Sequence, residues 1–233
     1  MSLEEYFGDW IRVINQKELN IVIDAMNRLY GSKKVCPAAE NVFRAFDLCP
    51  YNELKVVFIG QDPYPQRDVA TGILFGNRAD VPEDELSPSL KVVKEAAINF
   101  EVPHNSIIFD QTLENWARQG ILMINSALTV EMNKVGSHTM LWRPFISSLK
   151  NISMSNPGLI YVLFGSQAGT FQPYIKTGTV IKVPHPAYNA RTETKMNPKL
   201  FTDINRELKS KYGITIKWYQ EYDHYGESYV GNR

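Results

Sequence analysis

The segment Val56-Val57-Phe58-Ile59-Gly60-Gln61-Asp62-Pro63-Tyr64 decides the fold, because a continuous apolar run ends abruptly in a polar loop that contains proline. Such a run predicts a strand that is buried on both faces. Similar runs recur at residues 121–124, 160–164 and 180–183. Because helical segments separate these runs, the sequence predicts right-handed crossovers and a parallel sheet.

Helical periodicity fills much of the remaining chain. Helices are expected at 17–30, 37–48, 89–100, 112–118, 142–152, 168–175 and 198–212. Residues 221–233 are polar and contain glycine, which predicts a frayed tail. The sequence therefore predicts a single domain over 1–233, with a helical part at 1–50 and an α/β core at about 51–220. The expected fold class is a three-layer α/β/α arrangement around a short, central, four-stranded parallel sheet.

Composition excludes several classes of protein. The 233 residues are 44% hydrophobic and 21% charged, which is typical of a soluble globular domain and not of a disordered chain. No apolar run approaches the ~20 residues of a spanning helix, and the acidic start lacks a signal region, so we expect a cytoplasmic protein without membrane contact. Two cysteines are too few for a disulfide scaffold or a four-thiolate cluster.

The charge balance limits how nucleic acid could be bound. Lys and Arg total 25 and Asp and Glu total 25, so the net charge is zero. This balance argues against binding through a broad basic surface, but it is compatible with a local basic groove.

A polar side chain follows each predicted strand. These side chains are Asp62, Asn125, Ser166 and His185. The carboxyl ends of parallel strands meet at one edge of a sheet, where α/β proteins build their ligand sites. We therefore expect a carboxylate, an amide, a hydroxyl and an imidazole to converge into a hydrogen-bonding and acid–base site.

Familiar cofactor and metal motifs do not occur in the sequence. It contains no G-x-G-x-x-G after the first strand, no P-loop and no H-E-x-x-H, and its four histidines lack the spacing of metal ligands. The sequence therefore predicts a site that works without a cofactor or a metal ion.

Five ordered motifs resemble those of family 1 uracil-DNA glycosylases. Gly60-Gln61-Asp62-Pro63-Tyr64 and Gly72-Ile73-Leu74-Phe75 resemble the water-activating loop, and residues 116–130 resemble the uracil-binding strand. Ser87-Pro88-Ser89-Leu90 resembles the Pro-rich phosphate loop, Gly165-Ser166 the Gly-Ser loop, and His185-Pro186 the start of the minor-groove loop. The resemblance runs from about residue 56 to 218.

The resemblance implies roles for the residues of the base pocket. Asp62 would orient or activate the attacking water and stabilise a cationic sugar, and His185 would hydrogen-bond the uracil O2. The residues implied to surround the base are Asn125, which would read O4 and N3, Phe75, which would stack, Tyr64, which would exclude a 5-methyl group, and Gln61, which would line the pocket.

The resemblance also implies contacts with DNA. Ser87, Ser89 and Ser166 would hold phosphates, and His138 corresponds to a position near the DNA backbone. The implied partners are uracil-containing DNA, single- or double-stranded, and a proteinaceous glycosylase inhibitor. The enzyme is expected to be a monomer.

The chain departs from the family pattern in two loops. Pro65 follows Tyr64 where the family has His, and residues 66–71 are not glycine-rich. Ala187-Tyr188-Asn189 stands where the family has Ser-Pro-Leu, so a phosphate-binding serine and the apolar wedge are missing. Tyr188 and Asn189 are then the candidates for contact with the opened base stack. The change predicts a stronger preference for single-stranded or mismatched substrate.

The sequence is interpreted as a monofunctional, metal-independent uracil-DNA glycosylase of base excision repair, which leaves an abasic site. Two alternatives remain open. One is a relative with another base preference, such as a mismatch-type glycosylase. The other is a catalytically weakened, glycosylase-like DNA-binding or replication accessory protein.

Overall fold

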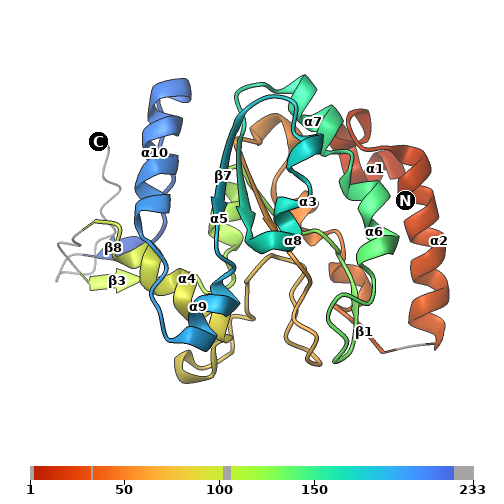
Figure 1. Ribbon diagram of the computed structural model, residues 1–233, viewed down its shortest axis with the longest axis horizontal. Helices are drawn as coiled ribbons and strands as arrows, with labels where there is room; N and C mark the ends of the chain where they lie inside the picture. The colour runs from red at the N-terminus through yellow and green to blue at the C-terminus, as the bar shows by residue number, and fades with distance from the viewer. Residues whose placement is uncertain (1–2, 33, 102–105, 223–233) are drawn as a thin grey trace.

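A four-stranded parallel sheet forms the centre of the computed structural model, which describes residues 3–32, 34–101 and 106–222. The strands are β2 (Val56–Gly60), β4 (Ile121–Asn125), β6 (Ile160–Phe164) and β7 (Thr179–Val183), in the spatial order β4-β2-β6-β7. In Figure 1 their carboxyl ends point downward, toward α8 and α9. All four strands coincide with runs predicted from the sequence, within one residue at either end.

Helices cover both faces of this sheet because successive strand residues point to opposite sides. Val57 and Ile59 belong to one hydrophobic cluster, and Val56 and Phe58 belong to another. The first cluster includes residues of α2 (Gln16–Ser32), α3 (Arg44–Leu48), α6 (Thr139–Ile146) and α7 (Leu149–Ser155). The second includes residues of α4 (Pro88–Ile98), α5 (Glu114–Arg118) and α10 (Lys199–Tyr212). Figure 1 shows α4 and α10 on one side of the sheet and α2 and α6 on the other, so the three-layer fold class is confirmed.

Three predicted helices are broken in the structure. The one at 37–48 is a 3-10 turn, Ala39–Asn41, followed by α3, and the one at 142–152 is divided into α6 and α7. Pro144 lies inside α6 and removes one helical N–H, but α6 continues to Ile146, and the break between the two helices falls at residues 147 and 148. The prediction at 168–175 is replaced by α8 (Gly165–Gly169) and a 3-10 turn, Gln172–Tyr174.

The helix after β7 was missed. Residues after β7 were expected to form a loop, but Pro186–Thr192 is a helix, α9. His185 is its N-cap, with its side chain accepting the Ala187 N–H, and Pro186 occupies the first turn. Proline at this position is favourable because its missing N–H would have no helical partner in any case.

Short elements complete the chain. Near the amino terminus these are α1 (Leu3–Phe7) and 3-10 turns at Gly8–Arg12 and Tyr51–Glu53, and a further 3-10 turn is Glu83–Glu85. Two antiparallel ladders pair β1 (Val35–Cys36) with β5 (Val130–Glu131) and β3 (Ser106–Ile108) with β8 (Gln220–Tyr222). The predicted frayed tail is therefore wrong for residues 221 and 222, and its remainder, 223–233, lies outside the described residues.

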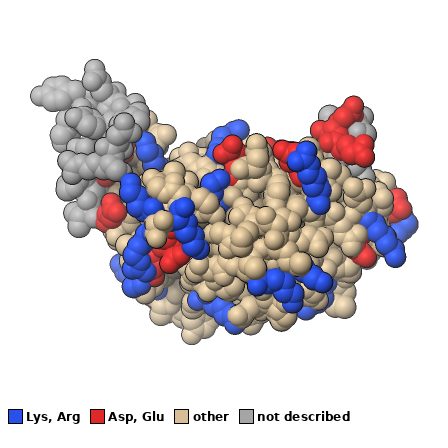
Figure 2. All heavy atoms as spheres, turned by 90° about the horizontal axis from the view of Figure 1, so that it is seen from above, with Lys and Arg blue, Asp and Glu red and all other residues tan. Residues whose placement is uncertain are grey.

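The molecular surface at the amino ends of the strands mixes both signs of charge. Figure 2 views this side from above and shows Lys and Arg interspersed with Asp and Glu, with wide uncharged areas between them. This face therefore does not offer a broad basic surface. Among the helices that the structure describes, none is long and apolar enough to cross a membrane.

Candidate active site

A pocket of about 300 Å³ opens at the carboxyl edge of the sheet. Eight residues predicted for the site line it together: Gln61, Asp62, Tyr64, Phe75, Ser89, Asn125, His185 and Tyr188. The other walls include Thr71, Gly72, Leu74, Val135 and Arg191. The expected convergence of Asp62, Asn125 and His185 in one crevice is therefore observed, whereas Ser166 lies elsewhere.

The floor of the pocket is set by the pairing of β2 with β4. Gly60 is the register partner of Asn125, and the next residue, Ser126, donates its N–H to the Gly60 carbonyl at 3.0 Å. A Cβ on Gly60 would lie 2.3 Å from Leu74 Cδ1 and 2.7 Å from Asn125 Oδ1. Glycine is thus required at position 60 for the Asn125 amide to occupy the floor.

The Asn125 amide has a free acceptor. Its Oδ1 is buried and has no hydrogen-bond partner among the residues that the structure describes. A buried carbonyl oxygen without a partner is unfavourable by about 1–3 kcal/mol. A ligand N–H placed in the pocket would remove this penalty, so the amide is suited to read the edge of a planar heterocycle.

One carboxylate oxygen of Asp62 is hydrogen-bonded within the protein, and the other is available to a ligand. Its Oδ2 accepts the backbone N–H of Gly136 at 2.8 Å, while Oδ1 is buried without a partner in the described part of the chain. Burial raises the pKa of Asp62, and the Gly136 N–H and Gln61 offset part of this rise. The free oxygen can accept a proton from water or face a developing positive charge.

Gly136 was not among the residues predicted for the site. It lies in the turn after β5, where Asn133 and Gly136 both have positive φ, +62° and +82°. Its contribution is a backbone N–H, which any residue type except proline carries. A run such as Asn133 to Gly136 indicates a turn, but the sequence does not indicate which carboxylate the turn would reach.

His185 is fixed in its neutral, donor form. Its Nδ1 accepts the Ala187 N–H at 3.1 Å, so the ring proton is on Nε2. Burial, and next the charge of Arg191, lower the pKa of His185 to about 4. The imidazole is therefore neutral at physiological pH and offers Nε2–H as a hydrogen-bond donor.

Aromatic rings form one wall. Phe75 has φ +65°, a conformation unusual for a bulky residue. Its ring packs edge-on against the rings of Phe164 and His185, with distances between ring centroids of 5.1 Å and 5.5 Å. The Tyr64 hydroxyl donates to the Phe75 carbonyl at 3.1 Å, which ties the two predicted base-contacting residues together.

Ser87, just before α4, is hydrogen-bonded inside the protein. Ser87 Oγ accepts from Asn77 Nδ2 at 2.9 Å, and Ser87 N–H donates to Asn77 Oδ1 at 2.7 Å. Both Ser87 and Ser89 are buried, and only Ser89 lines the pocket. Asn77, which is also buried, was not predicted, and it fixes the start of the Pro-rich loop.

Ser166 lies in a separate shallow depression. This depression is also lined by Thr170 and Lys182, and Arg143 donates to Thr170 Oγ1 at 3.1 Å. A hydroxyl with a nearby lysine is suited to a phosphate.

Two predicted DNA-contacting residues are buried. His138 bonds to Thr129 through Nδ1 at 2.9 Å, and only 6% of it is exposed. Asn189 is 7% exposed and donates to Thr194 Oγ1 and the Lys195 carbonyl. α9 turns the Asn189 side chain inward, so this residue, one of the two candidates for contact with the opened base stack, is not exposed for that contact. Tyr188, in contrast, is 52% exposed at the mouth of the pocket.

No group of three or more His, Cys, Asp or Glu side chains within residues 3–32, 34–101 and 106–222 is arranged to hold a metal ion. The pocket brings together a carboxylate, a neutral imidazole, an amide and aromatic rings.

Comparison with known proteins identifies related sequences. The sequence model of the Uracil DNA glycosylase superfamily matches residues 46–209. A protein named uracil-DNA glycosylase from Campylobacter jejuni subsp. jejuni serotype O:6 is 34% identical over 227 residues, which cover 94% of each chain. One of the same name from Fusobacterium nucleatum subsp. nucleatum is 30% identical over 222 residues, which cover 91% of this chain and 95% of the relative.

Solved structures share the fold. The crystal structure of mimivirus uracil-DNA glycosylase superposes with a TM-score of 0.69 at 23% identity, covering 94% of this chain and 93% of that one. The mimivirus UNG variant Y322F in complex with UGI gives a TM-score of 0.71 at 24% identity, and the match covers 85% of this chain and 81% of that one.

The lowered pKa of His185 predicts that its imidazole takes up a proton only at acidic pH. The imidazole should stay neutral in the folded protein down to about pH 5, because its pKa is about 4 and not the ordinary value near 6.5. Proton–nitrogen NMR of histidine-labelled protein measures this, with His185→Gln assigning the signal. A midpoint near 6.5 would contradict the assignment.

The same shift has a consequence for stability. The unfolded chain binds the His185 proton more tightly than the folded chain, so stability is full above pH ~6.5 and falls as the pH drops toward 4. Denaturation of His185→Gln should lack this component of the pH dependence.

Proposed function

The chain belongs to the Uracil DNA glycosylase superfamily, and on that premise we propose that its pocket releases uracil from DNA by hydrolysing the N-glycosidic bond. The product is an abasic site, as in base excision repair. The observation that carries this proposal is the pairing, in one pocket, of a carboxylate with a free oxygen and a neutral imidazole donor. A dissociative cleavage needs both, because it creates a cation and an anion.

The base is recognised inside the pocket after it leaves the helix, since the reacting bond is inaccessible within a stacked duplex. Asn125 Oδ1 accepts the uracil N3–H, and the amide NH₂ donates to O4. Phe75 supplies a stacking surface. Tyr64, held by its bond to the Phe75 carbonyl, occupies the space beside C5 and excludes a methyl group.

Bond cleavage moves the C1′–N1 electron pair onto the base. His185 Nε2–H hydrogen-bonds the uracil O2, where negative charge develops, and Asp62 faces the cationic sugar. Water then adds to C1′ as its proton passes to Asp62 Oδ1. Protonation of the departing uracilate by solvent and loss of the proton from Asp62 complete the hydrolysis.

Contacts with the DNA strand surround the pocket mouth. Ser166 and Lys182 are suited to one phosphate, and the exposed ring of Tyr188 stands where an apolar side chain would replace the flipped base. His138 is retained as a candidate near the backbone, although it is largely buried. Ser87 and Ser89 are assigned to the phosphate loop, where Ser87 acts through its bonds with Asn77.

The remaining expectations concern partners and location. The substrate is uracil-containing DNA, single- or double-stranded, and the enzyme acts as a cytoplasmic monomer without a metal or a cofactor. A proteinaceous inhibitor that fills the same mouth is a further partner, and the mimivirus UNG variant with a similar fold has been solved in complex with UGI.

Asp62→Asn tests catalysis. It should lower uracil release by two to three orders of magnitude, ~2.7–4 kcal/mol of transition-state stabilisation, because the amide cannot stabilise the cation or take the water proton. The assay is release from single- and double-stranded oligonucleotides in chelator, followed by alkaline cleavage. A parent protein inactive on both substrates would falsify the proposal and support the DNA-binding alternative.

Tyr64→Ala tests base choice. Removing the ring should permit thymine release, since steric exclusion discriminates against the methyl group more strongly than the ~1–3 kcal/mol of an attractive pocket. Tyr64→Phe is the matched control, because it removes only the bond to Phe75 and should keep thymine excluded. Equal thymine release by both variants, or by neither, would overturn the role of the ring.

Tyr188→Ala tests the exposed ring of α9. It should lower kcat/KM on duplex DNA more than on single strands, because only the duplex needs a replacement for the flipped base. Asn189→Leu should not increase duplex activity, since the Asn189 side chain points inward. The quantity to compare is the ratio of duplex to single-strand kcat/KM, and an unchanged ratio in Tyr188→Ala would remove Tyr188 from the interface.

A further inference from the structure

One wall of the pocket, residues 71–75, is pressed against the amino-terminal part of the chain. Gly72 has φ +82°, and a Cβ there would lie 1.9 Å from the Asn41 carbonyl oxygen. Asn41 ends the 3-10 turn that precedes α3. The backbone of the wall is thus in direct contact with this turn, and its position depends on the start of α3.

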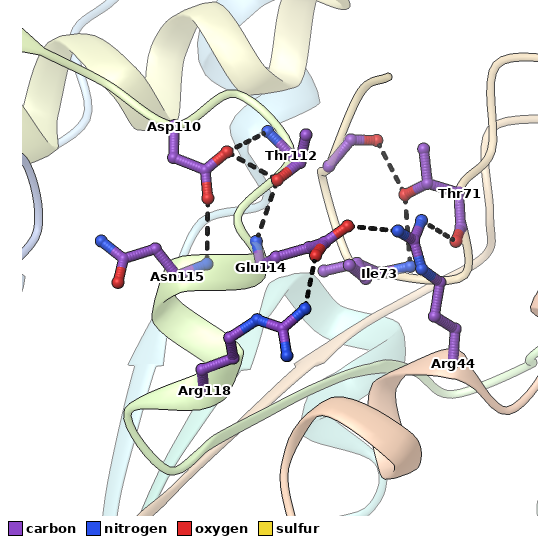
Figure 3. Close-up of polar contacts among 9 residues, drawn as sticks. Arg44, Thr71, Ile73, Asp110, Thr112, Glu114, Asn115 and Arg118 are labelled. Atoms are coloured by element: carbon purple, nitrogen blue, oxygen red, sulfur yellow. Dashed lines mark hydrogen bonds and ion pairs between the residues drawn. The ribbon is translucent and has the colours of Figure 1, made fainter. Parts of the chain in front are cut away.

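Arg44, the first residue of α3, reaches the same wall. Its Nη1 donates to the Thr71 carbonyl at 3.3 Å, and its Nη2 pairs with Glu114 of α5 (Figure 3). The two side chains are 32% and 24% exposed, so water screens the pair only partly. One planar guanidinium therefore joins the wall to two helices, which a lysine ammonium with a single nitrogen cannot do in the same geometry.

Glu114 is itself fixed by the turn that starts α5. Asp110 accepts the N–H groups of Thr112 and Asn115, both at 2.9 Å, and Thr112 Oγ1 accepts the Glu114 N–H at 3.2 Å (Figure 3). A Cβ on Gly76 would lie 2.6 Å from the Thr112 carbonyl oxygen. The same turn therefore orients Glu114 and contacts Gly76, the residue that directly follows the wall.

Thr71 connects the two ends of the wall. Its Oγ1 donates to the Gly76 carbonyl at 3.3 Å and accepts the Ile73 N–H at 3.4 Å. A shift of the Thr71 backbone therefore moves the segment that includes Phe75, and Phe75 already has a left-handed backbone conformation that the surroundings must maintain.

We propose that Arg44 is a positioning residue for the base pocket, holding the wall at Thr71 so that Phe75 meets the base, with Glu114 orienting Arg44. This inference rests on the proposed function. Arg44 does not line the pocket itself, so its effect reaches the base through backbone geometry. Displacements near 1 Å can lower a rate about a hundredfold when they disturb the alignment of a reacting group.

The test compares Arg44→Lys and Arg44→Met with the matched control Arg118→Met. Arg118 also pairs with Glu114, at 2.9 Å, but is 61% exposed and belongs to the side of Glu114 away from the wall (Figure 3). We expect kcat/KM for uracil release from a single-stranded oligonucleotide to fall at least tenfold in both Arg44 variants and less than twofold in the control.

Two binding measurements separate positioning from loss of folding. The inhibition constant of free uracil reports the pocket and should rise about tenfold in Arg44→Lys. The affinity for a uracil-free oligonucleotide reports phosphate contacts and should stay within twofold. Should Arg44→Met not fold, Glu114→Gln serves as the second variant and should weaken inhibition by uracil several-fold.

The outcomes distinguish failure of the proposed function from failure of the role of Arg44. A parent protein that releases no uracil removes the proposed function and this inference with it. An active parent, with Arg44→Lys equal to Arg118→Met in inhibition by uracil, overturns the inference alone. If Arg44→Lys weakened binding of free uracil and of uracil-free DNA equally, Arg44 would serve general stability. This result would also overturn the inference.

Discussion

Hydrogen bonding of β2 to a parallel neighbour on each side determines where the chemistry of this protein can occur. The register that pairs Gly60 with Asn125 brings the end of one strand level with the end of the next. The polar loop after β2 then bonds to the residues after β4, with Ala127 donating to the Gln61 carbonyl at 3.0 Å. Asp62 thus leaves the sheet beside Asn125 because backbone pairing places it there, before any side chain interaction contributes.

Burial in the pocket disfavours the charged forms of both Asp62 and His185. Burial raises the pKa of Asp62 and lowers that of His185, so each group is displaced toward its neutral form. For the histidine this is useful, since a neutral donor can strengthen its bond to an oxygen as charge grows there. For the carboxylate the Gly136 N–H and Gln61 support ionisation, while the second oxygen remains available. In the proposed mechanism, this arrangement suits charge that appears only during bond cleavage.

Much of this arrangement could be predicted from the sequence, because strands buried on both faces have a plain apolar pattern and the polar residues after them are readily located. Asp62, Asn125 and His185 follow from that logic. One failure has a plain physical cause, because α9 forms after His185 and turns Asn189 inward. Contributions made by the backbone, such as the Gly136 N–H, or by distant anchors, such as Asn77 and Arg44, leave no local pattern to find.

The order of strands in the sheet also affects how the protein is made. β7 is the last strand of the sheet in sequence and lies at its edge, next to β6, and it carries His185 at its end. Val56 of β2 pairs with Ile160 of β6, which is far away in the sequence. Sheets with such non-local pairing fold slowly. A nascent chain that has emerged only through β6 already contains Asp62 and Asn125, yet it exposes the unpaired edge of β6 and lacks the imidazole. Under the proposed function, the pocket is therefore complete only after this last edge strand has docked.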